Sequence, residues 1–235
     1  MENNSIIKIE NLVKRFPVGK TQFTALNGIN VSFGTGEFAG LVGPSGSGKT
    51  TLLNIIGSLD TPTSGEVEVL GRSVSTLTHK ESAKLRNSHI GFIFQTFNLL
   101  PVYTVYENVE FALLLQKLTA SERKTKVMDA LEWVGLTDKV KSRPAMLSGG
   151  ECQRVAIARS MVKKPEIVLA DEPTANLDSK NSHHILQTMK KLNRELKTTF
   201  IFATHDEKVM QYLNRIISLE DGKIVKDNLV TDAKN

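Results

Sequence analysis

The chain has 235 residues, 40% of them hydrophobic, which argues against disorder and suffices for one large domain or a core with a subdomain. Its apolar runs are far shorter than the roughly 18 residues that a membrane span needs, and we expect no secretory signal. A single cysteine, Cys152, excludes an internal disulfide and fits a reducing compartment. The net charge of +5 comes without a block of basic residues, so we expect no nucleic-acid partner.

Short strands and helices alternate over the first 95 residues, which favours an α/β fold with a parallel sheet. Alternating apolar and polar residues predict half-buried strands at 6–9 and 29–33, which we interpret as an antiparallel unit before the core. The other predictions in this part are strands at 38–42, 65–70 and 90–94, a helix that begins at 50, and a helix at 80–87.

A phosphate-binding loop is predicted between the strand at 38–42 and the helix that follows it. All fixed positions of G-x-x-x-x-G-K-[ST] are filled by Gly43, Pro44, Ser45, Gly46, Ser47, Gly48, Lys49, Thr50 and Thr51. Glycines allow backbone N–H groups to face phosphate oxygens, which the positive end of the helix also attracts. We expect Lys49 to reach the β- and γ-phosphates of a nucleotide and Thr50 to bind Mg²⁺. A plain turn would need neither the Lys-Thr pair nor three glycines at this spacing.

Beyond Gln95 the strand signal stops, because residues 105–118 and 122–134 carry helical periodicity with no strand between them. We therefore predict an α-helical insertion at 96–160. The pattern then returns to strands at 166–170, 198–203, 215–219 and 223–225, with a helix at 179–196, a turn at 220–222 and a loose tail at 230–235.

Ser148, Gly149, Gly150 and Glu151 open a predicted helix near the end of the insertion. Ser148 with Glu151 three residues later is typical of a capping box. The two glycines are unfavourable in a first helical turn, but they allow a phosphate to approach free N–H groups. At the tip of an insertion this turn cannot serve the phosphate loop of its own chain. A second copy, arranged head to tail about a two-fold axis, could bring it there.

Asp171 and Glu172 follow the apolar strand at 166–170 directly. Carboxylates at the carboxyl edge of a parallel sheet are typical of sites that organise magnesium. We expect Asp171 to hold Mg²⁺ through water and Glu172 to act as the general base toward the attacking water. The alternative is a strand that turns into solvent at Asp-Glu-Pro.

The phosphate loop, the Ser-Gly-Gly turn and the acidic pair follow one another in an order that resembles the ATPase subunit of an ABC transporter. The resemblance covers nearly the whole chain and implies one ABC ATPase domain over 1–235. Residues 1–95 and 161–235 would form a RecA-like P-loop NTPase core with an antiparallel β subdomain. Residues 96–160 would form an inserted helical subdomain that carries the signature motif.

The same resemblance implies roles for four more residues. Gln95 is similar to the glutamine that reaches Mg²⁺ and senses the transmembrane partner, and His205 is similar to the switch histidine near the γ-phosphate. Asp178 ends a segment that resembles the loop at the dimer contact. Phe16 falls where the family stacks an aromatic ring on adenine. The alternatives are a core position for Phe16 and a plain loop position for His205.

Residues 89–101 and 104–109 resemble the macrolide-efflux and lipoprotein-release branch of the family and its cell-division relative. The branch implies a dimer around two Mg-ATP and a permease with few spans and a large extracytoplasmic domain. The chain would then be peripheral, at the cytoplasmic face of the inner or plasma membrane. We expect the permease to contact a groove between Gln95 and the helix near Val105, with apolar contact from Phe97, Leu99, Leu100 and Tyr103.

Other functions remain open at this stage. Soluble ABC ATPases of DNA repair or chromosome structure share these motifs but carry long coiled-coil insertions, and the chain has no heptad run of that length. A non-hydrolysing regulatory binder is disfavoured because Lys49, Glu172 and His205 are all present. His183 and His184 are predicted at the surface of a helix. Glu151 departs from the glutamine that the family usually has there.

Overall fold

The computed structural model describes residues 5–230. Its strands are β1 (Ser5–Val18), β2 (Thr21–Gly34), β3 (Phe38–Val42), β4 (Ser64–Val69), β5 (Arg72–Ser73), β6 (Ile90–Ile93), β7 (Ile167–Asp171), β8 (Thr199–Thr204), β9 (Arg215–Glu220) and β10 (Lys223–Leu229). The α-helices are α1 (Lys49–Ile56), α2 (His79–His89), α3 (Val105–Glu110), α4 (Ala120–Trp133), α5 (Gly149–Met161), α6 (Ser179–Leu196) and α7 (Glu207–Met210). Short 3₁₀ helices are η1 (Val74–Thr76), η2 (Phe111–Leu113), η3 (Thr137–Lys139) and η4 (Pro144–Met146).

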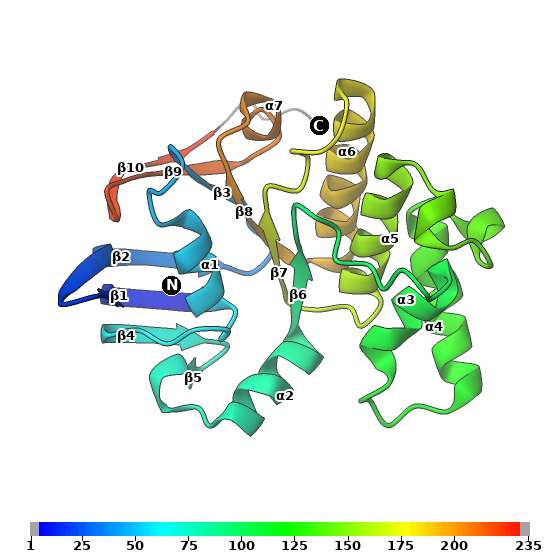
Figure 1. The fold of residues 1–235 in the computed structure, drawn as a ribbon, viewed down its shortest axis with the longest axis horizontal. Coiled ribbons are helices and arrows are strands. Elements are labelled where there is room, and N and C mark those ends of the chain that lie inside the picture. The colour runs from blue at the N-terminus through cyan, green and yellow to red at the C-terminus, as the bar shows by residue number, and fades with distance from the viewer. Residues whose placement is uncertain (1–4, 231–235) are drawn as a thin grey trace.

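Two sheets organise the molecule (Figure 1). The smaller sheet is antiparallel, in the order β2-β1-β4-β5, and the larger has the order β10-β9-β3-β8-β7-β6. In the larger sheet, β10 pairs antiparallel with β9, whereas β9, β3, β8, β7 and β6 pair in parallel. The α/β fold with an antiparallel N-terminal sheet is therefore confirmed. Within residues 5–230, no helix combines the length and the apolar character needed to cross a membrane.

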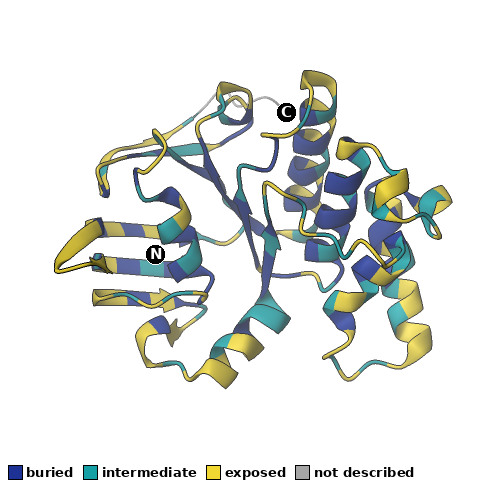
Figure 2. Ribbon diagram, in the orientation of Figure 1, coloured by how far each residue is buried: buried dark blue, intermediate teal, exposed yellow. Residues whose placement is uncertain are grey.

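The larger sheet is covered on both faces, as its continuous apolar strands require. One hydrophobic cluster joins it to α1 and the antiparallel sheet, and a second joins it to α3, α4, α5 and α6. Buried residues follow the central strands and the inner faces of α5 and α6 (Figure 2). Because α1 lies between the two sheets, the loop that precedes it is held at the carboxyl edge of the parallel strands.

The first two strands are much longer than the predicted 6–9 and 29–33. They form one hairpin in which Val18 pairs with Thr21. Register shifts interrupt the alternation of apolar and polar residues, and Asn11 and Gly28 adopt positive φ angles of 49° and 72°. A strand that bulges in this way loses the strict period of two on which the prediction depends.

The predicted helix at 105–118 is wrong in its second half, since α3 ends at Glu110 and gives way to η2. Leu114 and Leu115 are 53% and 84% exposed, so a longer helix would gain no core contact there. In contrast, α6 has the predicted bounds, 179–196. Helix α7 was not predicted, because four residues carry no periodic signal.

The proposed boundary between residues 160 and 161 falls at the last residue of α5, so the division into a core and a helical subdomain stays an interpretation. The predicted loose tail starts at Val230, whose N–H donates to the Asn214 carbonyl at 2.8 Å. The rest of that tail, 231–235, lies outside the described residues.

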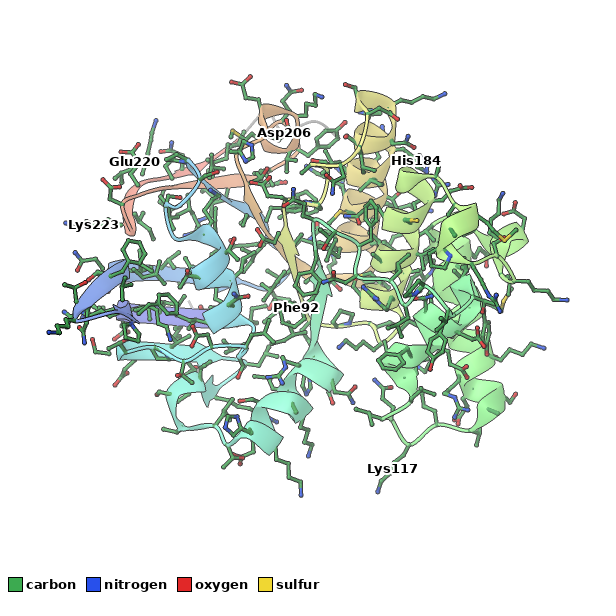
Figure 3. The ribbon with its side chains drawn as sticks, in the orientation of Figure 1. Phe92, Lys117, His184, Asp206, Glu220 and Lys223 are labelled. Atoms are coloured by element: carbon green, nitrogen blue, oxygen red, sulfur yellow. The ribbon has the colours of Figure 1, made fainter. Side chains whose placement is uncertain are left out.

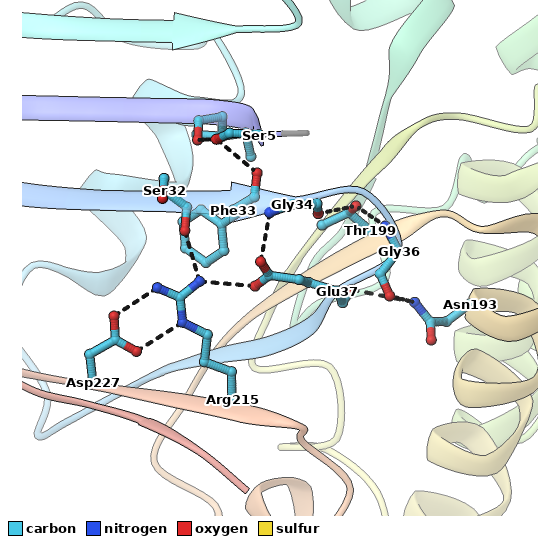
Figure 4. Close-up of polar contacts among 11 residues, drawn as sticks. Ser5, Ser32, Phe33, Gly34, Gly36, Glu37, Asn193, Thr199, Arg215 and Asp227 are labelled. Atoms are coloured by element: carbon cyan, nitrogen blue, oxygen red, sulfur yellow. Dashed lines mark hydrogen bonds and ion pairs between the residues drawn. The ribbon is translucent and has the colours of Figure 1, made fainter. Parts of the chain in front are cut away.

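Arg215 connects the two sheets (Figure 4). Its guanidinium donates to the Ser32 carbonyl of β2 at 2.7 Å, to Glu37 at 3.0 Å and, through two nitrogens, to Asp227 of β10. The turn after β9, flanked by Glu220 and Lys223 in Figure 3, contacts the phosphate loop: Gly222 donates its N–H to the Ser47 carbonyl at 3.1 Å. The antiparallel sheet and the phosphate loop are thus held in a fixed relation.

Candidate functional site

The loop between β3 and α1 has a backbone that side chains would obstruct. Gly46 and Gly48 have φ angles of 82° and 101°, a region that favours glycine. A Cβ on Gly43 would lie 2.1 Å from the Leu219 carbonyl oxygen, and one on Gly48 would lie 2.7 Å from the Ala25 carbonyl oxygen. The glycines of the motif are therefore required by the fold around the loop, in addition to any ligand.

The N-terminus of α1 has unused hydrogen-bond donors. Its N-cap is Gly48, which offers no side-chain cap, and the first turn contains no acidic residue. Because the first N–H groups of a helix have no intrahelical acceptor, they are available to an anion from outside. This agrees with the predicted use of the loop.

Lys49 is buried, with 7% of its surface exposed, and lies over the loop. Its ammonium donates to the carbonyl oxygens of Gly43 at 2.7 Å and Pro44 at 2.8 Å. Burial lowers the pKa of Lys49, and the nearby carboxylates of Glu172 and Asp171 oppose that effect. Within the described part of the chain, the Lys49 ammonium has only neutral carbonyl oxygens as acceptors and makes no salt bridge. A polyanion would give it a stronger, charge-assisted partner.

Thr50 and Asp171 meet across the pocket from α1 and the end of β7. The Thr50 hydroxyl lies 3.2 and 3.0 Å from the two carboxylate oxygens of Asp171. Burial raises the pKa of Asp171, which a bound cation would reverse. Hydroxyl and carboxylate oxygens fit Mg²⁺. Among residues 5–230, no group of three or more His, Cys, Asp or Glu is placed so that it could hold a metal ion.

Glu172 leaves β7 in a left-handed conformation, with a φ of 45°. Its N–H donates to the Ala203 carbonyl of β8 at 2.9 Å. One carboxylate oxygen accepts from the Thr204 hydroxyl at 3.0 Å, and the other lies 2.6 Å from Nδ1 of His205. Since a carboxylate only accepts, Nδ1 of His205 carries the hydrogen in this pair. The His205 side chain is 63% exposed, so it can change partners when a ligand enters.

One pocket of about 460 Å³ collects most of the predicted site. Its walls are formed by Phe16, Phe23, Ala25, Ser45, Gly46, Gly48, Lys49, Thr50, Thr51, Gln95, Asp171, Glu172, Ala175 and His205. The predicted phosphate loop, Gln95, the acidic pair and His205 therefore lie together, although they come from distant parts of the sequence.

The aromatic end of this pocket was only partly predicted. Phe16 is 36% exposed with the Lys14 ammonium 4.9 Å from its ring centre, so the alternative of a core position is wrong. Phe23 was missed, although it pairs directly with Phe16 across the hairpin and is 55% exposed. The missing signal was the length of the hairpin, because facing aromatics become visible only when the register of the two strands is known.

The Ser-Gly-Gly turn lies outside this pocket. Ser148 and Glu151 form the predicted capping box: the Ser148 N–H donates to Glu151 at 2.8 Å, and the Glu151 N–H donates to the Ser148 hydroxyl at 3.2 Å. A Cβ on Gly150 would lie 2.4 Å from the Asn181 amide oxygen, so a larger residue there would require the Asn181 side chain to move. Of the described residues that line the pocket, none comes from 148–150.

Asp178 is the N-cap of α6 and accepts from the N–H of Asn181 at 2.8 Å and from its amide at 2.6 Å. It does not line the pocket. The segment before it does reach the site, because Asn176 donates its amide to the Gln95 carbonyl at 2.9 Å. His183 and His184 were predicted at the surface, and both are exposed (His184 is labelled in Figure 3). His183 in addition makes a hydrogen bond with the Tyr212 hydroxyl.

Comparison with known proteins gives consistent matches. The model of the ABC transporter family matches residues 26–175. The lipoprotein-releasing system ATP-binding protein LolD of Pseudoalteromonas translucida (strain TAC 125) is 44% identical over 222 residues, which are 94% of this chain and 96% of that protein.

Solved structures agree as well. The dimeric ATP-binding cassette MJ0796, bound to ADP and Pi in a post-hydrolysis state, is 41% identical with a TM-score of 0.87, over 95% of this chain and 98% of that one. A second dimeric structure of MJ0796 is 42% identical with a TM-score of 0.88, over the same shares. The protein cbiO1 of Clostridium perfringens, part of the ABC transporter complex cbiONQ, is 30% identical with a TM-score of 0.87, over 97% of this chain and 89% of that one.

Proposed function

Because the chain belongs to the ABC transporter family and is an ATP-hydrolysing subunit, we propose that two copies close head to tail around two Mg-ATP and drive a membrane permease. The observation that carries this proposal is the division of the site. The pocket contains the phosphate loop, Asp171 and Glu172 but no residue of 148–150, while α5 presents that turn elsewhere. A second copy would supply it, and the similar cassette MJ0796 is described as a dimer.

Within each half, the residues would divide the work by type. The α1 N–H groups and Lys49 bind the phosphates, and Phe16 with Phe23 contacts the base. Thr50 and Asp171 would hold Mg²⁺, with Gln95 at the same pocket wall. When bound, the ion would neutralise charge on the phosphates.

Glu172 would take the proton of the attacking water as ADP leaves the γ-phosphate. Its carboxylate is held at the end of β7, opposite the phosphate loop, and does not bond to Thr50. His205 would exchange its bond to Glu172 for one to the phosphate. In this way the entry of ATP would free one oxygen of the base.

We also propose that the work is of the lipoprotein-release type, on the basis of the 44% identity to LolD. The chain would then act as a peripheral subunit at the cytoplasmic face of the membrane, below a permease with a large extracytoplasmic domain. Its transported substrate would be bound by that permease.

A groove of about 500 Å³ fits a segment of the permease. It lies between α2, β6 and η2, and its exposed apolar side chains are Leu59, Phe111 and Leu115. The residues predicted for this contact do not line the groove, and Leu99 is partly buried against the core, so the contact through Phe97, Leu99, Leu100 and Tyr103 stays a prediction. Three cations, Arg86, Arg159 and Lys163, also line the groove. Burial lowers the pKa of Lys163 to about 8, so it is still largely charged at neutral pH.

Glu172→Gln tests the proposed chemistry. The amide keeps the shape but cannot take a proton, so steady-state hydrolysis should fall about 10³-fold while ATP binding persists and ATP traps a dimer. Phosphate release and light scattering with Mg-ATP measure the two effects. The matched control is Glu68→Gln, an exposed carboxylate on β4 that should change neither. Turnover by Glu172→Gln above a few per cent of wild type would exclude Glu172 as the base.

A further inference from the structure

The last residue of β8, Thr204, contacts Glu172 from outside the pocket walls. Thr204 is fully buried, and its hydroxyl makes two hydrogen bonds. It accepts from the Asp206 N–H at 3.0 Å and lies 3.0 Å from a carboxylate oxygen of Glu172. A backbone N–H can only donate and a carboxylate can only accept, so the Thr204 hydroxyl must point its hydrogen at Glu172.

We propose that Thr204 is a positioning residue for Glu172, an inference that rests on the proposed role of Glu172 as the base. Two backbone bonds hold Glu172, one to the Ala203 carbonyl and one from the Ala175 N–H, and two side chains contact its carboxylate, the Thr204 hydroxyl and His205. The backbone bonds do not orient the carboxylate. His205 is 63% exposed and is expected to turn toward the nucleotide, which leaves Thr204 as the side chain that still orients the carboxylate.

The geometry favours positioning over a gain in reactivity. A hydrogen bond to a carboxylate stabilises its charged form and so makes it a weaker base. Misplacing a catalytic group by about 1 Å costs on the order of 100-fold in rate. That cost exceeds the gain in rate that a modestly stronger base would give after loss of the hydrogen bond. Loss of the Thr204 hydroxyl should therefore slow hydrolysis. Thr204 does not line the pocket, so nucleotide affinity should not change.

Thr199, at the other end of β8, provides a matched control. It is also fully buried, accepts from the Gly36 N–H at 2.8 Å, and donates to the Gly34 carbonyl at 3.0 Å. Replacing either threonine by valine removes one donor and leaves one backbone N–H without its acceptor. Both variants lose the bond from a backbone N–H, but the second lost bond goes to the Glu172 carboxylate in Thr204→Val and to a neutral carbonyl in Thr199→Val. Thr199→Val therefore reports what the same substitution costs in stability at a site remote from the pocket.

The experiment compares Thr204→Val, Thr204→Ser and Thr199→Val in the full chain, with kcat and KM for ATP from phosphate release and Tm from calorimetry. We expect kcat of Thr204→Val to fall about 10- to 100-fold with KM unchanged, and Thr204→Ser to return to within about threefold of wild type. Thr199→Val should keep kcat within about twofold despite its own loss in Tm. Thr204→Val combined with Glu172→Gln should still trap a dimer with ATP.

The inference is overturned if Thr204→Val keeps the kcat of Thr199→Val, if its defect lies in KM, or if serine does not restore turnover. Should Thr204→Val not fold, the contrast between Thr204→Ala and Thr204→Ser decides the same question. The two proposals fail in different ways. If Glu172→Gln still turns over ATP, the proposed role of Glu172 as the base is wrong. If Glu172→Gln is inactive and Thr204→Val is fully active, only the proposed role of Thr204 is wrong.

Discussion

Two helices of this chain begin with glycine-rich turns, and they begin differently. Helix α1 has Gly48 as its N-cap, no side-chain cap and no acidic residue in its first turn. Helix α5 has Ser148 as its N-cap, a complete capping box and Glu151 in its first turn. The free N–H groups of α1 need a ligand from outside, whereas those of α5 are partly satisfied by the chain itself.

The difference indicates an order of events. A single copy can bind a nucleotide at α1, because the phosphate loop, Lys49 and Asp171 already line one pocket. The turn at α5 is stable without a ligand, so contact with the nucleotide of a second copy would be a separate and weaker step. Substitutions at α1 should therefore affect nucleotide binding itself, and substitutions at α5 should affect only dimer formation.

The largest effect is expected at α1. Lys49→Ala removes the buried ammonium, so ATP binding measured by calorimetry should weaken about 100-fold or more, as expected for loss of charge-assisted bonds worth roughly 3 kcal/mol. Lys20→Ala, in the exposed turn of the first hairpin, is the control and should bind as wild type. Tight ATP binding by Lys49→Ala would contradict the assignment of the phosphate loop.

An intermediate effect is expected for Gly150→Ala. The new Cβ would lie 2.4 Å from the Asn181 amide oxygen. It would also leave less room for the nucleotide of the second copy to approach the first turn of α5. ATP binding by the single copy should be unchanged, and the ATP-trapped dimer, in the Glu172→Gln background, should weaken about 10-fold, a loss of roughly 1.4 kcal/mol. Light scattering over a range of protein concentrations measures this.

Asn181→Ala, added to Gly150→Ala, separates two causes of that loss. It removes the two nearest atoms that the new Cβ meets, the amide oxygen and Cγ of Asn181, and leaves the Cβ of residue 181 at 3.2 Å. If the dimer is restored, the glycine serves the packing of α5 on α6. If the dimer stays weak, the glycine serves the approach of the nucleotide. A defect of Gly150→Ala in ATP binding by the single copy would contradict the division between the two helices.

The sequence predicts the parts of this comparison unequally, for physical reasons. Local chemistry determines the loop before α1 and the capping box of α5, so both were predicted from short motifs. Long-range packing determines the rest. Only the fold shows that a side chain at Gly150 would meet α6, that Phe23 lines the pocket, and that the Thr204 hydroxyl bonds to Glu172. Thr204 had a possible signal, because it is the polar residue between a buried strand and His205.

The smallest effect concerns Glu151, which holds a negative charge where a nucleotide of the second copy would approach. One oxygen accepts from the Ser148 N–H, and the other lies 3.7 Å from the Lys139 ammonium. The structure shows Lys139 to be the ion-pair partner of Glu151. The pKa of Glu151 is lowered chiefly by the hydrogen bond from the Ser148 N–H, and to a smaller extent by the charges of Lys139 and Arg154.

Two like charges roughly 8 Å apart repel by about 2 kcal/mol at an effective dielectric of about 20, before screening by salt. Lys139 offsets part of this. Glutamine can make the same capping bond, so Glu151→Gln in the Glu172→Gln background should tighten the ATP-trapped dimer by only about three- to fivefold, more at low salt than at high salt. Lys139→Ala should weaken the dimer with either residue at position 151, because the ammonium attracts the nucleotide directly.

The pH dependence gives an independent check with a defined sign. The pKa of Glu151 is lowered in the folded chain, so its contribution to stability is present above the ordinary glutamate pKa and is lost as pH falls through the folded value. Glu151→Gln should therefore lose less stability than wild type on acidification. At neutral pH it should be slightly less stable than wild type, because the charged cap and the helix dipole favour glutamate. An unchanged dimer at low salt, together with this pH signature, would mean that Glu151 serves α5 alone and that its charge does not reach the nucleotide.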